Sequence, residues 1–163
     1  MLLLAVVALG VTKAGYLPVP GVGGAITLLH IPAIIAGIME GPVGGAVVGT
    51  VFGLISVLTF PPNDWLVQLL PRMLIGPAAA LVFRTVSQSA QGGARISLAA
   101  AAAALAGTLV NTLGVCLLAG LQGLFPPDQL VVMAAVHGTA EGMLAILVTV
   151  PVAVSYWQEE KPR

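Results

Sequence analysis

The sequence predicts an all-α integral membrane protein with six transmembrane helices. Of its 163 residues, 58% are hydrophobic and only 7% are charged, and the mean hydropathy is +1.06. Soluble globular chains carry about 25% charged residues, so most of this chain must lie in hydrocarbon. A spanning helix takes about 20 residues, which leaves room for six or seven spans and no separate soluble domain. We therefore treat residues 1–163 as a single transmembrane domain.

The charge balance and the cysteine content exclude several classes of function. Six Lys and Arg balance six Asp and Glu, so no basic face is present to bind nucleic acid. The single cysteine, Cys116, excludes an intrachain disulfide and a thiolate metal cluster, and we interpret it as a small apolar helix residue. No stretch matches G-x-x-x-x-G-K-[ST], so ATP hydrolysis, if used, must come from a partner. No cofactor is expected.

Six apolar segments alternate with loops rich in Pro, Gly or polar residues. The expected helices cover residues 2–14, 25–39, 43–58, 69–86, 96–120 and 129–157. The first is short for a span, because about 13 residues at 1.5 Å each cover only some 20 Å of a 30 Å core. A cleaved signal peptide is its alternative interpretation, but no basic residue precedes the apolar run and Lys13 follows it.

Local signals mark the first loops and the third helix. The loop 15–24 reads GYLPVPGVGG, and a Gly-Pro turn at Gly41 separates the second helix from the third. Four glycines then recur at every fourth residue: Gly41, Gly45, Gly49 and Gly53. One face of this helix therefore carries no side chains, which predicts tight packing against a neighbouring backbone.

The later loops are equally distinct. Loop 59–68 contains FPPNDWLVQ, in which Trp65 suits the membrane interface. The fourth helix has Pro71 and Arg72 in its first turn, where proline is tolerated. The polar run SQSAQGGAR separates the fourth and fifth helices. The Phe-Pro-Pro phrase of the second loop recurs before the sixth helix, either as the trace of a repeat or as two independent helix stops.

Basic residues predict the orientation. With the amino end inside, four basic residues lie on the cytoplasmic side, and Lys13 and Arg72 lie at the outer side. The four are Arg84, Arg95, Lys161 and Arg163. We therefore expect cytoplasmic amino and carboxyl ends, with loops 15–24 and 59–68 on the outer face.

An ionisable residue inside a span costs about 2.5 to 3.5 kcal/mol at the bilayer centre, so each one is a site hypothesis. Arg72 lies about one turn from the outer end of its helix. Either it extends to the interface and binds lipid phosphate, or it is a fixed cation for an anionic substrate group.

Asn111 and His137 share a depth of roughly 12 to 14 Å below the outer boundary, on adjacent antiparallel helices. Interhelical hydrogen bonding is one interpretation of Asn111, whereas for the whole set we favour a cavity that opens outward. His137 and Glu141 are one turn apart on one helical face. A metal site would need further ligands, and His30 is the only other histidine. An intramembrane hydrolase would need a nucleophile or metal that no motif supplies, so we predict neither a metal site nor an enzyme.

Four phrases together resemble the substrate-binding S components of energy-coupling factor (ECF) vitamin transporters, and most of all the pantothenate-type members. The phrases are HIPAIIAGIMEGPVGGAVVGTVFGLISVL at 30–58, LLPRMLIGPAAALVFR at 69–84, GTLVNTLGV at 107–115 and AEGMLAILVTVP at 140–151. The resemblance covers nearly the whole chain, in order.

The resemblance implies an S-component-like bundle of six helices that binds a water-soluble vitamin from outside, in a cavity capped by loops 15–24 and 59–68. It carries over Arg72, Asn111, Glu141 and the loop residues around His30 and Trp65, and His137 joins this set because of its depth and spacing. It also implies docking, through small residues of the first helices, onto a transmembrane coupling subunit that two ATPase subunits drive. The implied docking residues are Gly10, Ala14, Gly41, Gly45 and Gly49.

We therefore expect the S component of an ECF-type ABC transporter in the plasma membrane, surrounded by membrane lipid, with pantothenate as its vitamin. Folate, cobalamin, riboflavin and pyridoxine stay open as substrates. Outside transport, the alternative is a small membrane scaffold that uses the glycine stripe only for packing.

Overall fold

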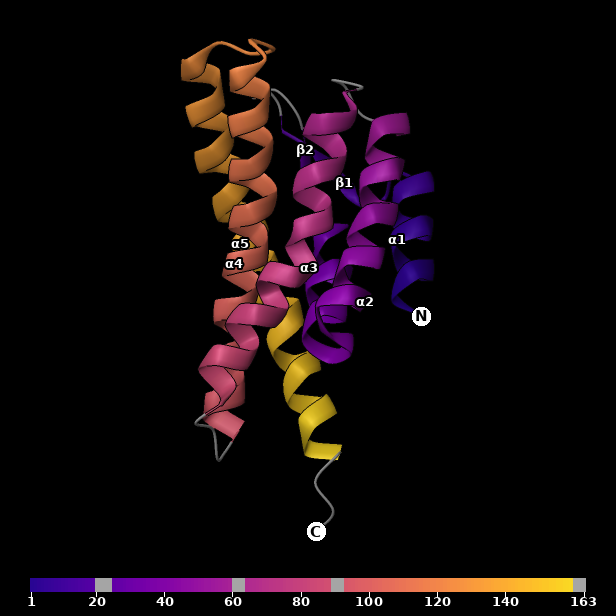
Figure 1. Cartoon of the computed structure of the whole chain (residues 1–163), viewed down its shortest axis with the longest axis vertical. Coiled ribbons are helices and arrows are strands. Elements are labelled where there is room, and N and C mark those ends of the chain that lie inside the picture. Colours follow the sequence, from indigo (N-terminus) through magenta and orange to yellow (C-terminus); the bar gives the residue numbers. More distant parts are fainter. Residues whose placement is uncertain (20–24, 60–63, 89–92, 160–163) are drawn as a thin grey trace.

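A computed structural model describes residues 1–19, 25–59, 64–88 and 93–159, with side chains described as far as Trp157. Within these residues, five helices and a two-stranded sheet follow one another along the chain (Figure 1). Their bounds are α1 (Leu2–Val11), β1 (Tyr16–Pro18), β2 (Ala25–Thr27), α2 (His30–Thr59), α3 (Trp65–Ser87), α4 (Gly93–Leu121) and α5 (Pro127–Glu159).

Four of the described helices are long and apolar enough to cross a membrane. They are α2, α3, α4 and the part of α5 from Pro127 to Trp157. Helix α1 ends at Val11, three residues before its predicted end, and its 10 residues rise only about 15 Å. The described chain therefore has the make-up of a multi-pass, helical membrane protein, but the six predicted spans are not confirmed.

The second and third predicted helices are joined in α2, with a break at the predicted Gly-Pro turn. Gly41 has φ 87° and ψ −175°, and glycine adopts a positive φ without strain. Pro42 follows at the first position of the next helical piece, where its missing N–H removes no hydrogen bond. The chain folds back here: a Cβ atom on Gly45 would lie 2.8 Å from the Cα of Gly37, whereas eight residues of straight helix would separate them by about 12 Å.

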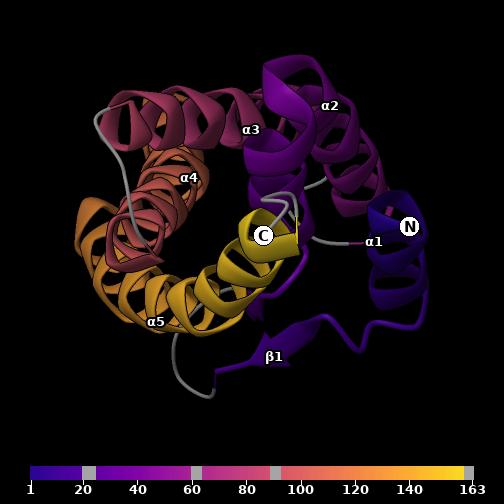
Figure 2. The same ribbon diagram turned by 90° about the horizontal axis from the view of Figure 1, so that it is seen from below.

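A short β-hairpin stands where the second helix was predicted to begin. The prediction is wrong for residues 25–27, which form β2 and pair antiparallel with β1, with Tyr16 opposite Thr27. Strands of three residues are too short to show the alternation that reveals a strand in a sequence. In Figure 2, β1 lies between α1 and α5.

Helix α3 begins earlier than predicted, at Trp65, inside the expected loop 59–68. The reason is a cap, because the Asp64 carboxylate accepts a hydrogen bond from the N–H of Val67 at 2.8 Å. The first Phe-Pro-Pro phrase, at 60–62, lies outside the described residues. The second ends where α5 begins, at Pro127.

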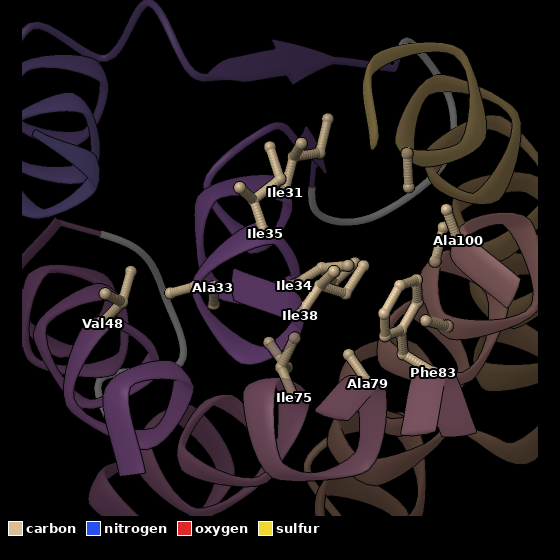
Figure 3. Close-up of a cluster of buried hydrophobic side chains, with 14 of the residues drawn as sticks. Ile31, Ala33, Ile34, Ile35, Ile38, Val48, Ile75, Ala79, Phe83 and Ala100 are labelled. Carbon is tan, nitrogen blue, oxygen red and sulfur yellow. The ribbon is translucent and has the colours of Figure 1, made fainter. Parts of the chain in front are cut away.

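Consecutive helices pack against one another from α1 to α5, and α5 returns to contact α2. Seen along the long axis, α2, α3, α4 and α5 follow one another around a ring (Figure 2). The hydrophobic core fills the inside of this arrangement, where Ile34 and Ile38 of α2 lie close to Ala79 and Phe83 of α3 (Figure 3).

Glycines bring the backbones of α2 and α3 into direct contact. A Cβ atom on Gly45 would lie 2.6 Å from the Cα of Gly76, and one on Gly37 would overlap the Gly76 carbonyl. Gly49 faces the backbone carbonyl of Arg72 in the same way. The tight packing predicted for the glycine stripe is therefore confirmed, and the neighbouring backbone is α3 of the same chain.

Gly76→Ala is expected to destabilise the protein by about 1 to 3 kcal/mol, because its Cβ would overlap backbone atoms that cannot rotate away. Gly138→Ala is the matched control, since its Cβ would meet its nearest neighbour at an ordinary 3.6 Å. This control is expected to be neutral or stabilising by up to about 1 kcal/mol. Unfolding in detergent, followed by tryptophan fluorescence, measures both changes. Equal stability of the two variants would contradict the glycine contact.

Candidate functional site

Glu141 is the centre of a buried polar cluster. Its side chain is only 2% exposed, and its carboxylate accepts three hydrogen bonds from two other elements. The backbone N–H of Thr27 donates to Oε1 at 2.8 Å, and on α4 the Thr112 hydroxyl and the Asn111 amide donate to Oε2 at 2.9 and 3.3 Å. The carboxylate of α5 thus joins the hairpin to α4.

Gly138 and Gly142 lie near Glu141 on α5 and face α4. Gly138 faces Thr112 at 3.6 Å and Gly142 faces Leu105 at 3.4 Å, measured from the position of an added Cβ atom. Both distances are ordinary van der Waals contacts, so a small side chain at either position would fit without moving α4.

Helices α2 and α3 also contribute polar residues near Glu141. Their position follows from an apolar layer in which α2, α3 and α4 meet. In this layer a Cβ atom on Gly107 would lie 2.5 Å from Cγ1 of Ile34 and 3.3 Å from Cγ2 of Ile75. About one helical turn from this layer, toward the same end of the molecule, lie three of the predicted site residues. They are His30 on α2, Arg72 on α3 and Asn111 on α4.

Several buried polar atoms of this cluster bind no described residue. The ring of His30 is 0% exposed and lies beside the backbones of Thr27 and Glu141, but neither ring nitrogen forms a hydrogen bond. The same holds for Nε2 of His137 and Oδ1 of Asn111. Buried polar atoms in proteins are nearly always hydrogen-bonded, so this concentration in one place is typical of a ligand site.

Arg72 is a buried cation, held by its own helix. Its side chain is 7% exposed, and Nη1 donates to the carbonyl of Val67 at 2.7 Å. In a regular helix that carbonyl would accept from residue 71, but Pro71 has no N–H, so the carbonyl is available to the guanidinium. The guanidinium carbon also lies 5.4 Å from the centre of the Phe52 ring. Of the two interpretations of Arg72, its burial favours the fixed cation over lipid phosphate binding.

The structure brings five of the six predicted substrate-binding residues into one region. The Glu141 carboxylate interacts electrostatically with His30, Arg72 and His137, and it binds Asn111 directly. Trp65 is the exception. It is 58% exposed at the first residue of α3, about 10 Å along the helix from Arg72.

Sequence reasoning missed three residues of the cluster. Thr112 follows Asn111 in the Asn-Thr phrase, and its hydroxyl could have been included from that position. Phe52 looks like an ordinary core residue in the sequence, and Thr27 contributes only a backbone N–H, which no side-chain pattern reveals. The last two are assigned by the structure alone.

The predicted docking residues are mostly used within the chain. Gly10 faces Ile55 of α2, while Gly45 and Gly49 face α3. Gly41 is buried at the α2 break, and Ala14 is exposed. Docking through these residues stays a prediction, although only Ala14 among them is exposed for a partner to contact.

Outside this polar cluster, the structure has an apolar groove. A groove of about 690 Å³ between α3 and α4 is lined by apolar side chains, Leu74, Leu109 and Leu113 among them, so it does not suit a water-soluble ligand. Among the described residues, no group of three or more His, Cys, Asp and Glu side chains is placed to hold a metal ion.

Glu141→Leu is expected to destabilise the protein by about 2 to 5 kcal/mol. The three groups that donate hydrogen bonds to the carboxylate would then stay buried without an acceptor. Glu141→Gln is expected to lose less, since its amide can still accept from Thr27 and can donate to the Thr112 hydroxyl oxygen. Thr139→Val, on the exposed face of the same helix, is the control and is expected to change stability by less than about 0.5 kcal/mol. Denaturation in detergent gives all three values, and a neutral Glu141→Leu would contradict the role of the carboxylate.

Comparison with known protein families gives a match that covers nearly the whole chain. Residues 2–153 match the family model described as the ECF transporter, substrate-specific component. No curated protein sequence matches the chain. The matched region includes the five described helices as far as residue 153, together with the hairpin and every residue of the polar cluster. The chain therefore belongs to the family of substrate-specific components of ECF transporters.

Proposed function

We propose that this chain binds a water-soluble vitamin with a carboxylate group, pantothenate in the first place, for uptake through the membrane. The observation that carries the proposal is the burial of a cation and an anion in one polar cluster without an ion pair between them. The hydrogen bonds of Arg72 and Glu141 go to other groups, so among the described residues neither charge is neutralised by direct contact with the other.

The charges of this region suit a ligand with an anion at one end and hydrogen-bond donors at the other. The planar guanidinium of Arg72 binds a carboxylate through parallel N–H groups. Glu141 accepts from a hydroxyl, and the ring nitrogens of His30 and His137 donate or accept. Pantothenate has a carboxylate at one end, two hydroxyls at the other and an amide between them. Folate and biotin also carry a carboxylate at one end and N–H donors at the other, so they fit the same charges, but neither has the pair of hydroxyls that pantothenate offers to Glu141.

Transport requires other subunits. Members of the family are substrate-binding subunits of ECF transporters rather than enzymes, and this sequence has no Walker A motif. We propose that two ATPase subunits supply the energy through a transmembrane coupling subunit that contacts the α1 side near Ala14.

The proposed orientation has both ends in the cytoplasm and loops 15–24 and 59–68 on the outer face. The basic residues of the sequence support it. The hydrogen bond from Thr27 to Glu141 adds support for the first loop as the cover of the site, because β2 follows that loop directly. In this orientation the vitamin enters from outside.

Arg72→Ala is expected to weaken pantothenate binding by about tenfold to a hundredfold, because it removes a charge-assisted contact with the carboxylate. Arg72→Lys keeps the charge but not the planar fork, so an intermediate loss is expected. Arg84→Ala, on the exposed part of the same helix, is the matched control. Calorimetric titration of the purified proteins in detergent measures the three affinities.

Equal affinities of Arg72→Ala and wild type would remove Arg72 from the site. Binding of another vitamin, with pantothenate inactive, would keep the transporter function and change the substrate. Absence of binding for every vitamin tested would favour the scaffold alternative.

A further inference from the structure

Ser56 carries a buried hydroxyl on α2 that no described residue binds. Its side chain is 1% exposed, and its Oγ atom forms no hydrogen bond within the described part of the chain. The two threonines of the same helical piece, Thr50 and Thr59, each donate to the backbone carbonyl one turn earlier, at 2.7 Å. Ser56 does not form this bond. Buried hydroxyl groups are nearly always hydrogen-bonded, so Ser56 is expected to have a partner from outside the described residues.

The side of α2 that carries Ser56 faces α3. At about 100° per residue, Ser56 lies between Phe52 and Gly53 around the helix axis. A Cβ atom on Gly53 would lie 3.0 Å from the Cα of Leu69. The ring centre of Phe52 lies 5.4 Å from the guanidinium carbon of Arg72. Both neighbours of Ser56 on the helix surface therefore contact α3, and Ser56 points between them.

Contacts between the two helices show which of their residues lie at the same level. Gly49 lies against the backbone carbonyl of Arg72, and a Cβ atom on Gly53 would lie 3.1 Å from the backbone carbonyl of Gln68. Four residues forward on α2 thus correspond to four residues back on α3. The two helices run antiparallel, and by this pairing residue 67 of α3 lies opposite residue 54 of α2.

The guanidinium of Arg72 lies close to the level of Ser56. Its Nη1 donates to the carbonyl of Val67 at 2.7 Å, and Ser56 is two residues, or about 3 Å along the axis, from the position opposite Val67. The ring of Phe52 contacts the guanidinium from the preceding turn of α2. The hydroxyl and the guanidinium therefore share one region between α2 and α3.

The guanidinium keeps an unused donor in this region. Its Nε atom is buried and forms no hydrogen bond with a described residue. Together with Nη2, Nε forms the edge of a guanidinium that binds a carboxylate through two parallel N–H groups. The hydroxyl proton of Ser56 is a third donor for the same carboxylate.

We propose that Ser56 is a further specificity-determining residue, which donates its hydroxyl hydrogen bond to the carboxylate held by the Nε edge of Arg72. This assignment rests on the proposed function, because it needs an anionic substrate at Arg72. It gives both unused groups one partner. It also places the carboxylate end of the substrate between α2 and α3, beside the ring of Phe52, and leaves Glu141 for the hydroxyl end.

The test is calorimetric titration of the whole chain in detergent with two probes, pantothenate and pantothenol, its alcohol analogue without the carboxylate. Ser56→Ala removes the hydroxyl and introduces the residue that favours helices most, so the ligand-free fold is expected to persist. This variant is expected to weaken pantothenate binding about tenfold and to change pantothenol binding less than about twofold.

Two control variants remove hydroxyl groups that already have a partner in the chain. Thr50→Val acts on the same helix, where the hydroxyl donates to the carbonyl of Ala46. Ser155→Ala makes the same chemical change as Ser56→Ala on the exposed surface of α5, where the hydroxyl donates to the carbonyl of Pro151. Both are expected to keep pantothenate affinity within about twofold of wild type.

The outcomes are distinct. If Ser56→Ala weakens both probes equally, the hydroxyl only supports the packing of α2 on α3 and the assignment is wrong. If wild type binds pantothenate, Arg72→Ala weakens it and Ser56→Ala does not, the assignment alone is wrong and the proposed function stands. If wild type binds neither probe, the proposed substrate and the assignment both fail.

Thermal unfolding without ligand decides the case in which wild type binds pantothenate but not pantothenol. A weaker pantothenate affinity of Ser56→Ala with an unchanged unfolding temperature supports the contact with the carboxylate. The same loss of affinity together with a lower unfolding temperature assigns Ser56 to packing and overturns the proposal.

Discussion

The arrangement of β2, α4 and α5 relative to one another depends on the buried carboxylate of Glu141. An ionised group in hydrocarbon is costly, and it is tolerated where enough donors surround it. Here the donors come from β2 and α4, while the carboxylate comes from α5. Three segments that are distant in the sequence must therefore meet at one point, and the hairpin takes its place as a consequence of this meeting.

A second and independent device positions the opposite charge. Backbone contact between α2 and α3 depends on Gly37, Gly45 and Gly76, and it fixes how far α3 stands from the rest of the bundle. Within α3, Pro71 leaves the Val67 carbonyl available, and that carbonyl binds the guanidinium of Arg72. The cation is thus oriented by its own helix rather than by Glu141. Neither charge neutralises the other directly, so both stay available to a ligand. The packing of the helices thereby leads to the proposed binding chemistry.

Much of the fold and of the polar cluster could be predicted from the sequence, because the sequence patterns behind them are strong. Composition indicated the membrane class, the Gly-Pro turn located the α2 break, and isolated polar residues in apolar helices pointed to Arg72, Asn111 and Glu141. The resemblance to S components agrees with the family match over residues 2–153.

The remaining features have no comparable signal. The six spans are not confirmed, because only four described helices are long and apolar enough to span a membrane. The second and third predicted helices form one element broken at Gly41, and α1 has only 10 residues. The glycine stripe indicated close packing but could not say which backbone would pack there, and α3 takes that place. Trp65 was predicted for the site from its loop, whereas the cap at Asp64 places it on the exposed start of α3. Backbone donors such as that of Thr27 are invisible in a sequence, since every residue except proline has one.

The central claim is that the polar cluster binds a small water-soluble acid. Mass spectrometry tests it most directly: the protein is purified from membranes and denatured, and the ligand that it releases is identified. The account predicts pantothenate in near-stoichiometric amount from wild type and much less from a protein that lacks the Arg72 guanidinium. Release of no small polar molecule from wild type, together with no vitamin binding on titration, would contradict it.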